Sequence, residues 1–144
     1  MRRFKTFVVL LCVSMGLASM AAAATIEGTS GDDTLVGTSG ADTIHAKAGS
    51  DTVNALGGRD TVYGGRGQDR LSGGAGGDTL NGGRSADKLI GGPANDTLNG
   101  GRGNDTINAT DGSGGDTVNC GDGNDAVNAD EGDVIASDCE DVVG

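Results

Sequence analysis

The chain has 144 residues, of which 29 are glycine, 21 are acidic and 10 are basic, and its formal net charge is −11. It contains no tryptophan, one tyrosine and two phenylalanines. This composition excludes an ordinary globular enzyme with a large buried core, because too few apolar side chains are available. It also argues against nucleic acid as a partner, because phosphates would repel so acidic a surface. The chain is therefore either disordered or ordered by a bound cation.

Residues 1–24 are predicted to form a secretory signal peptide. Three basic residues lie among the first five, an apolar run covers residues 8–17, and alanines occupy positions 21–24. Signal peptidase accepts small residues of this kind at its cleavage site. The apolar run is too short for a stable membrane anchor, which is the alternative interpretation. Cleavage would remove the three basic residues and change the net charge from −11 to −14, because every acidic residue lies downstream. We therefore expect a secreted, extracellular protein that does not insert into a membrane after cleavage.

Two cysteines, Cys120 and Cys139, lie downstream of the leader, whereas Cys12 lies inside its apolar run. In an oxidising compartment, two cysteines most simply form one disulfide. A thiolate metal site would need more ligands than these. A reactive thiol pair is the alternative, although the spacing is not C-x-x-C. We expect a structural disulfide between Cys120 and Cys139.

A nine-residue period is the main signal of the sequence. Aspartates recur at every ninth position from Asp33 to Asp105. After a two-residue insertion they continue at Asp116 and Asp125, and two shorter steps lead to Asp133 and Asp141. An aliphatic residue stands two positions after each of these aspartates, the last one being Val143. A short, fixed period of this kind indicates a solenoid.

Each repeat divides into a turn and a short strand. The six residues G-G-x-G-x-D are predicted to form the turn, because glycine permits positive φ and leaves room for inward carbonyl groups. The next three residues, for example 79–81, are predicted to form a strand whose aliphatic side chain points inward. Two repeats complete one coil, so residues 18 apart stack along the same edge.

The stacking predicts a column of carboxylates along each edge, with neighbours about 4.8 Å apart. Like charges at this spacing repel each other, and a narrow aliphatic core cannot offset both the repulsion and the loss of chain entropy. A divalent cation between successive turns would relieve the repulsion. Calcium accepts about 6–8 oxygen ligands of mixed type, whereas magnesium requires a tighter octahedron. Zinc prefers histidine or cysteine. The sequence therefore predicts several Ca²⁺ ions as the cofactor.

The pattern G-G-x-G-x-D-x-U-x, where U is aliphatic, resembles the RTX (hemolysin-type) calcium-binding repeats. The resemblance covers residues 28–144 and is best in residues 64–72, 73–81 and 100–108. It implies an all-β fold, a right-handed parallel β-roll (β-solenoid) with calcium ions between stacked turns. It also implies that turn carbonyl groups and the aspartate at the sixth position hold the calcium. The residues to which it assigns these roles are Asp33, Asp42, Asp51, Asp60, Asp69, Asp78, Asp87, Asp96, Asp105, Asp116 and Asp125, together with Gly64, Gly73, Gly82, Gly91 and Gly100.

Some copies depart from the repeat pattern, and we expect them to bind calcium weakly or to leave one site empty. After the insertion, the segment from Cys120 to Glu140 resembles the disulfide-closed cap of small secreted members of the family. Solenoids need atypical ends to cover an open edge. We therefore expect a β-roll over residues 25–119 and a cap of the same solenoid over residues 120–144. The departures are Thr29, Thr38, Lys47 and Leu56 at the second glycine, Ala46 and Ala55 at the first, and Ser85 and Ala94 at the last.

The sequence favours a calcium-binding protein with a structural or adhesive extracellular role over an enzyme. It contains neither H-E-x-x-H nor G-x-S-x-G, and His45, the single histidine, is expected to be an exposed bystander. A non-catalytic accessory module of an enzyme or toxin system is an alternative. Ice binding is another, because ranks of threonine and asparagine could order water. Arg70 and Lys88 are expected to interrupt the threonine rank, which argues against it. Calcium is the expected partner, and the sequence identifies no protein or surface partner.

Overall fold

The computed structural model describes residues 22–112 and 115–144, so most of the predicted signal peptide, residues 1–21, lies outside the described part. Within this part the chain forms fourteen strands and no helix, and hence no helix that could cross a membrane. The strands form two seven-stranded parallel sheets, which we call the odd sheet and the even sheet. The odd sheet contains β1 (Thr25–Glu27), β3 (Thr43–Ala48), β5 (Thr61–Arg66), β7 (Thr79–Arg84), β9 (Thr97–Arg102), β11 (Thr117–Asp122) and β13 (Val134–Ile135). The even sheet contains β2 (Thr34–Val36), β4 (Thr52–Asn54), β6 (Arg70–Ser72), β8 (Lys88–Ile90), β10 (Thr106–Asn108), β12 (Ala126–Asn128) and β14 (Asp141–Val143).

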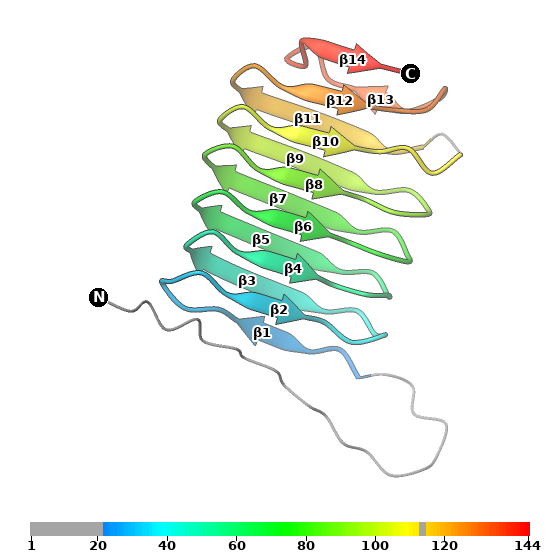
Figure 1. The fold of residues 1–144 in the computed structure, drawn as a ribbon. Helices are drawn as coiled ribbons and strands as arrows, with labels where there is room; N and C mark the ends of the chain where they lie inside the picture. The colour runs from blue at the N-terminus through cyan, green and yellow to red at the C-terminus, as the bar shows by residue number, and fades with distance from the viewer. Residues whose placement is uncertain (1–21, 113–114) are drawn as a thin grey trace.

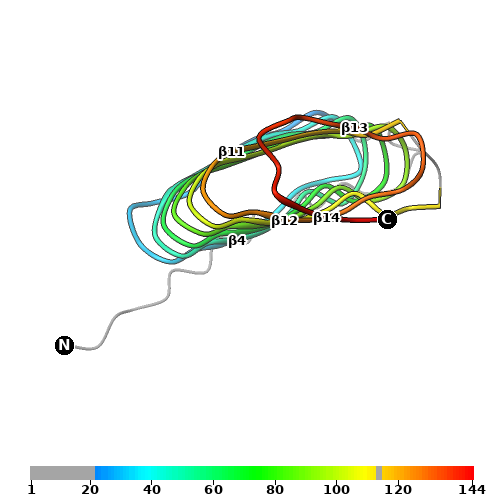
Figure 2. The same cartoon turned by 90° about the horizontal axis from the view of Figure 1, so that it is seen from above.

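The chain alternates between the two sheets, so that one coil contains two repeats. The coils stack in chain order (Figure 1). Seen along the stack, they superimpose as a flattened oval with strands on its long sides and turns at its ends (Figure 2). Thr61 pairs with Thr79 in the odd sheet, and Leu71 pairs with Leu89 in the even sheet. Each pair is 18 residues apart, which confirms the predicted parallel β-roll.

The insertion after Asp105 leaves the sheet register intact. Thr97 pairs with Thr117, 20 residues further along the chain, and the next residues continue in step. The two additional residues are therefore accommodated in the turn between β10 and β11. A turn can absorb extra residues because it lies outside the hydrogen-bonded strands.

Strand length differs between the two sheets. Strands of the even sheet have three residues, as predicted, whereas β3, β5, β7, β9 and β11 have six. The additional pairing runs through the first turn residues, for example from Gly65 to Gly83 and from Arg66 to Arg84. The prediction of three-residue strands is therefore wrong for these five strands of the odd sheet, because their first turn residues continue the ladder of backbone hydrogen bonds.

The core between the sheets is a double row of aliphatic residues, one from each repeat. Leu71, Leu80, Leu89 and Leu98 are each at most 2% exposed. The first turn position also points inward, and small residues occupy it. Burial of one leucine contributes about 1.5–3 kcal/mol, whereas ordering the backbone of each residue costs about 1–2 kcal/mol. One aliphatic residue per nine is therefore a weak core, and the stack depends on further interactions.

The outer face of the odd sheet carries an unbroken rank of threonines, because this position is threonine in six consecutive strands. Next to this rank, asparagines of neighbouring strands are joined by hydrogen bonds, with Asn99 Nδ2 2.9 Å from Asn81 Oδ1. Arg70 and Lys88 lie on the even sheet. They interrupt the threonine positions of the even sheet, between Thr52 and Thr106, but they leave the rank of the odd sheet unbroken, because alternate repeats belong to different sheets. The rank consists of Thr25, Thr43, Thr61, Thr79, Thr97 and Thr117.

The C-terminal coil is closed by the predicted disulfide between Cys120 and Cys139. Beyond it, β14 pairs with β12 so that Val142 stands opposite the core residue Val127. Val142 rather than Val143 thus takes the aliphatic position of the repeat. The predicted register of this last copy is wrong by one residue, because the final turns are shorter than those before them.

Candidate metal centres

Each repeat aspartate is buried and connects two coils. The backbone N–H of Asp69 donates to Asp87 Oδ1 at 2.8 Å, and that of Asp78 donates to Asp96 Oδ1 at 2.7 Å. The same contact recurs along both edges and forms two aspartate ladders. The eleven predicted aspartates all belong to these ladders and are at most 3% exposed: Asp33, Asp42, Asp51, Asp60, Asp69, Asp78, Asp87, Asp96, Asp105, Asp116 and Asp125.

The second carboxylate oxygen has no hydrogen-bond partner in nine of these eleven residues. Burial of a charged oxygen without a partner is unfavourable, because the group loses its water and gains nothing in return. Native structures rarely retain such groups unless an ion or ordered water satisfies them. The nine oxygens therefore indicate where positive charge is needed. They are the Oδ2 atoms of Asp51, Asp60, Asp69, Asp78, Asp87, Asp96, Asp105, Asp116 and Asp125.

Burial raises the pKa of eight ladder carboxyl groups, most strongly in the central coils: Asp51, Asp60, Asp69, Asp78, Asp87, Asp96, Asp105 and Asp116. The pKa rises to about 6 for Asp69 and Asp78 and to about 7 for Asp87 and Asp96. Loss of water is the main cause, the hydrogen bond from the backbone N–H of the preceding aspartate opposes it, and repulsion by the neighbouring carboxylate adds to it. Charge on these residues is thus unfavourable in the coil without a compensating cation.

Carbonyl oxygens of the next coil converge with the unpartnered carboxylate oxygens. A Cβ atom added to Gly64 would lie 2.5 Å from Asp69 Oδ2 and 2.6 Å from the carbonyl oxygen of Gly82. A Cβ added to Gly82 would lie 2.6 Å from both Asp87 Oδ2 and the carbonyl oxygen of Gly100. Carboxylate and carbonyl oxygens around a small space are the ligands that calcium prefers. The five predicted glycines, Gly64, Gly73, Gly82, Gly91 and Gly100, are all buried at this position.

Four of the departing repeats keep the turn conformation of the glycine copies. Lys47, Leu56, Ser85 and Ala94 have φ values of 81°, 78°, 83° and 88°. This left-handed region is unfavourable for residues that carry a Cβ atom. The stacked turns nevertheless impose it, and the aspartates of these copies retain unpartnered oxygens. The turn geometry therefore does not distinguish these copies from the glycine copies. Their expected weak calcium binding stays a prediction.

The first turn at each edge is different, because threonine satisfies its aspartate. The backbone N–H of Thr29 donates to Asp33 Oδ2 at 2.5 Å, and its hydroxyl group donates to Oδ1 at 3.2 Å. Thr38 makes the same two contacts with Asp42, at 2.5 and 3.0 Å. Asp33 and Asp42 consequently differ from the other nine aspartates. The threonines are visible in the sequence as departures from the repeat, but their hydrogen bonds are evident only in the structure.

Two acidic residues of the last coil end the ladders. Asp133 Oδ1 accepts the backbone N–H of Asp116 at 3.0 Å, and Glu140 Oε2 accepts that of Asp125 at 3.0 Å. Glu140 thus takes the place for which the sequence suggested Asp141. It follows Asp125 by 15 residues rather than 18, and the longer side chain of glutamate spans the remaining distance. The spacing alone therefore did not identify it.

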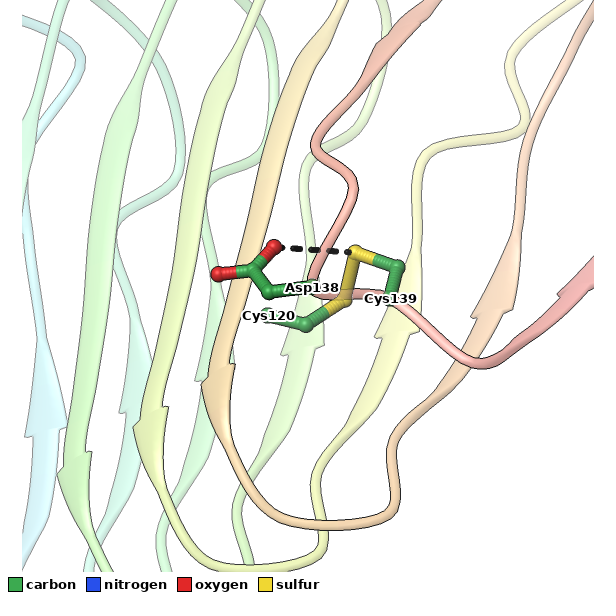
Figure 3. Close-up of side chains that lie close together, drawn as sticks. All are labelled: Cys120, Asp138 and Cys139. Atoms are coloured by element: carbon green, nitrogen blue, oxygen red, sulfur yellow. Dashed lines mark hydrogen bonds between the residues drawn. A yellow bond between two sulfur atoms is a disulfide. The ribbon is translucent and has the colours of Figure 1, made fainter.

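A third group of potential ligands, Cys120, Asp138 and Cys139, does not form a metal site. The two sulfur atoms are bonded to each other and provide no thiolate (Figure 3). Asp138 Oδ1 lies 3.9 Å from the sulfur of Cys139. A disulfide sulfur has no proton to donate, so this contact is not a conventional hydrogen bond. The metal ligands of the described residues are therefore sought in the two ladders.

The sequence matches the family model of the RTX calcium-binding nonapeptide repeat in four copies, at residues 27–62, 36–71, 45–80 and 72–107. Together these copies cover more than half of the chain. The chain belongs to the RTX calcium-binding repeat family. RTX repeats bind calcium between successive turns of a β-roll, which is the space into which the unpartnered oxygens point. No curated protein matches the chain.

Gly82→Ala is predicted to weaken calcium binding by this RTX chain, because the methyl group would enter the space shared by Asp87 Oδ2 and a carbonyl oxygen. We expect the calcium concentration at the folding midpoint to rise about tenfold, equivalent to about 1.4 kcal/mol. Gly31→Ala is the control, since its added Cβ would have Thr29 Oγ1 as nearest neighbour, at 4.0 Å. Calcium titration followed by circular dichroism measures both variants. Equal midpoints would contradict the role assigned to Gly82.

Calcium-dependent folding is predicted to weaken as the pH falls below about 5. The raised pKa values of Asp87 and Asp96 mean that the metal-free coil holds more protons than the unfolded chain between about pH 3.8 and 7. Without calcium, the stability of the coil therefore increases as the pH falls through this range. Calcium-induced folding, however, starts from the disordered chain, whose aspartates have an ordinary pKa of about 3.8, so calcium displaces protons only below about pH 5. The folding midpoint is therefore expected to change little between about pH 8 and 5.5 and to rise several-fold at about pH 4. A midpoint that does not rise at about pH 4 would contradict this coupling.

Proposed function

We propose that this calcium-binding repeat protein is secreted, folds when calcium binds and has a structural or adhesive role outside the cell. The observation that carries the proposal is the row of buried Oδ2 atoms without partners along both edges of the roll. A stack with one small aliphatic residue per repeat cannot retain these charges by packing alone. Calcium would neutralise the charges and connect successive coils, and folding would therefore depend on it.

The ligands that we propose are the carboxylates of the nine aspartates and nearby backbone carbonyl groups. Asp69 with the carbonyl oxygen of Gly82, and Asp87 with that of Gly100, are the pairs that the geometry supports best. Asp33 and Asp42 would contribute less, because threonine already donates hydrogen bonds to their carboxylates. The strongest sites would thus lie in the central coils.

Secretion is supported by the composition of residues 1–24 and by the disulfide of the last coil, because disulfides persist mainly in oxidising compartments. Extracellular calcium modules typically bind calcium with dissociation constants of about 10⁻⁴–10⁻³ M.

We propose no catalytic activity, as is typical of calcium-binding β-roll repeats. His45 stacks its ring on Tyr63, with 4.8 Å between the ring centroids, in the outer face of the odd sheet.

Calcium-dependent folding is the direct test of the proposal. Without calcium, the chain lacking residues 1–24 is expected to be expanded and mostly disordered, because its charges repel and its core is small. Calcium in the millimolar range should induce the circular dichroism of a β protein and reduce the hydrodynamic radius. Asp78→Asn should raise the calcium midpoint about tenfold, since it alters an unpartnered carboxylate in the middle of a ladder.

Asp33→Asn is the matched control for this experiment. Its carboxylate accepts hydrogen bonds from Thr29 and lies in the first turn, so the calcium midpoint should change less than about twofold. Magnesium at the same concentration should induce much less structure, because it requires a tighter octahedral site. A compact β-rich state in excess chelator would contradict calcium-dependent folding. Equal effects of the two substitutions would contradict the ladder model.

Ice binding is a second candidate function, favoured by the unbroken threonine rank on the odd sheet. Hydroxyl groups repeat there at the strand spacing of about 4.8 Å, beside the hydrogen-bonded asparagines. If this face orders water, the calcium-loaded protein should show thermal hysteresis, and Thr79→Tyr should abolish it. Thr106→Tyr, on the even sheet, should have no effect. Absence of thermal hysteresis in the unaltered protein would exclude this function.

A further inference from the structure

The basic residues of this acidic chain gather at one edge of the roll. Downstream of residue 24 the sequence has seven lysines and arginines, all of them within the described residues. Six of them lie at the ends of odd-sheet strands or at the starts of even-sheet strands, next to the turns that lead from the odd sheet to the even sheet, and we call this edge the basic edge. Arg59 is the exception and lies at the opposite edge. The six are Lys47, Arg66, Arg70, Arg84, Lys88 and Arg102.

The register of the sheets places these cations next to one another. Arg66 is paired with Arg84, and Arg84 with Arg102, in neighbouring strands of the odd sheet. Arg70 is paired with Lys88 in the even sheet. Like charges directly opposite each other destabilise a sheet. Folding alone therefore does not explain why the cations occupy these positions.

Four of the six cations have no internal partner. Lys47 forms an ion pair with Glu27 at 2.9 Å, and Arg102 approaches Asp122 at 3.6 Å. The remaining four, Arg66, Arg70, Arg84 and Lys88, are exposed and make no ion pair or side-chain hydrogen bond within residues 22–112 and 115–144. We call these four the central cluster.

The central cluster does not serve to neutralise the neighbouring aspartate ladder. Among the described residues, neither Asp69 nor Asp87 forms an ion pair with a basic side chain. The exposed guanidinium and ammonium groups are thus directed to solvent, where an external anion can reach them.

Two shallow grooves meet at Arg70 and Lys88 of the cluster, and mainly polar side chains line the larger one. One groove, of about 420 Å³, lies along the basic edge and is lined by Ser50, Gln68, Arg70, Lys88, Asn104 and Thr106, with the buried Asp69 and Asp87 behind them. The other, of about 240 Å³, lies over the even sheet and shares Arg70 and Lys88 with the first. Hydroxyl and amide groups beside cations can bind a ligand that has both hydroxyl groups and negative charges.

We propose that the basic edge binds an acidic polysaccharide, a linear chain of sugars that carry carboxylate or sulfate groups. Arginine binds such oxyanions through paired hydrogen bonds, and the neutral side chains of the groove can bind sugar hydroxyl groups. The cations repeat once per coil, about 4.8 Å apart along the stack, which suits an extended ligand parallel to the axis.

Nucleic acid fits the basic edge less well. Proteins that bind single strands stack bases on aromatic side chains. Tyr63 is the single Phe, Tyr or Trp residue of the described chain, and it lies on the outer face of the odd sheet. A polysaccharide has no bases that need such stacking, and it presents hydroxyl groups that the neutral side chains of the groove can bind.

The test measures binding of heparin, which carries both sulfate and carboxylate groups, to the calcium-loaded full-length mature chain. Arg70→Gln is expected to weaken binding at least fivefold, and Arg70→Gln with Lys88→Gln about thirtyfold, because each removes a charge-assisted contact. Arg59→Gln, which removes the same charge at the opposite edge, should change the affinity less than about twofold. Circular dichroism in calcium verifies that each variant is folded, so a folding failure is distinguished from a binding failure.

Neutral dextran and a single-stranded DNA oligonucleotide are the control ligands. Heparin binding that is lost in the Arg70 variants and kept in Arg59→Gln would support the proposal. An unaltered folded protein that does not bind heparin would overturn it, as would equal losses in the Arg70 and Arg59 variants. Binding of the oligonucleotide as tightly as heparin, or of dextran at all, would overturn the assignment to an acidic polysaccharide.

Discussion

The structure depends on buried aspartates that are hydrogen-bonded on one side and unpartnered on the other. In nine of the eleven ladder aspartates, one carboxylate oxygen accepts the backbone N–H of an aspartate in the preceding coil, as between Asp69 and Asp87. This contact holds successive coils in register, but it also draws a charge out of water. The apolar core is too small to compensate. The need for a cation between the coils follows from this single arrangement, and membership of the RTX family identifies the cation as calcium.

The ends of the two ladders are built from different chemistry than the middle. At the start, Thr29 and Thr38 donate hydrogen bonds to the first aspartates, so no charge remains without a partner there. At the finish, Asp133 and Glu140 supply the last acceptors, and the disulfide holds the final coil in place. A solenoid must end its repeating contacts in some such way, because the terminal coils have a neighbour on one side only.

The four sides of the roll differ chemically, although the repeats resemble one another. The odd sheet presents threonine and asparagine, and the even sheet presents Arg70 and Lys88. One edge carries most of the basic residues, whereas the other carries Arg59. The buried positions are constrained by the ladders and the core. Most of the variation between repeats therefore lies at the outward positions, and it gives each side of the roll its own chemistry.

The nine-residue period by itself determined the β-roll, the aspartate columns, the inward aliphatic residues and the calcium hypothesis, because each depends on contacts repeated in every copy. The disulfide followed from there being two cysteines downstream of the leader. The tertiary structure decided what depends on neighbouring coils. It separated Arg70 and Lys88 from the threonine rank, and it brought Glu140 into the ladder through a shorter turn and a longer side chain. Such contacts join residues 15 to 20 positions apart, and they exist only once the coils are stacked.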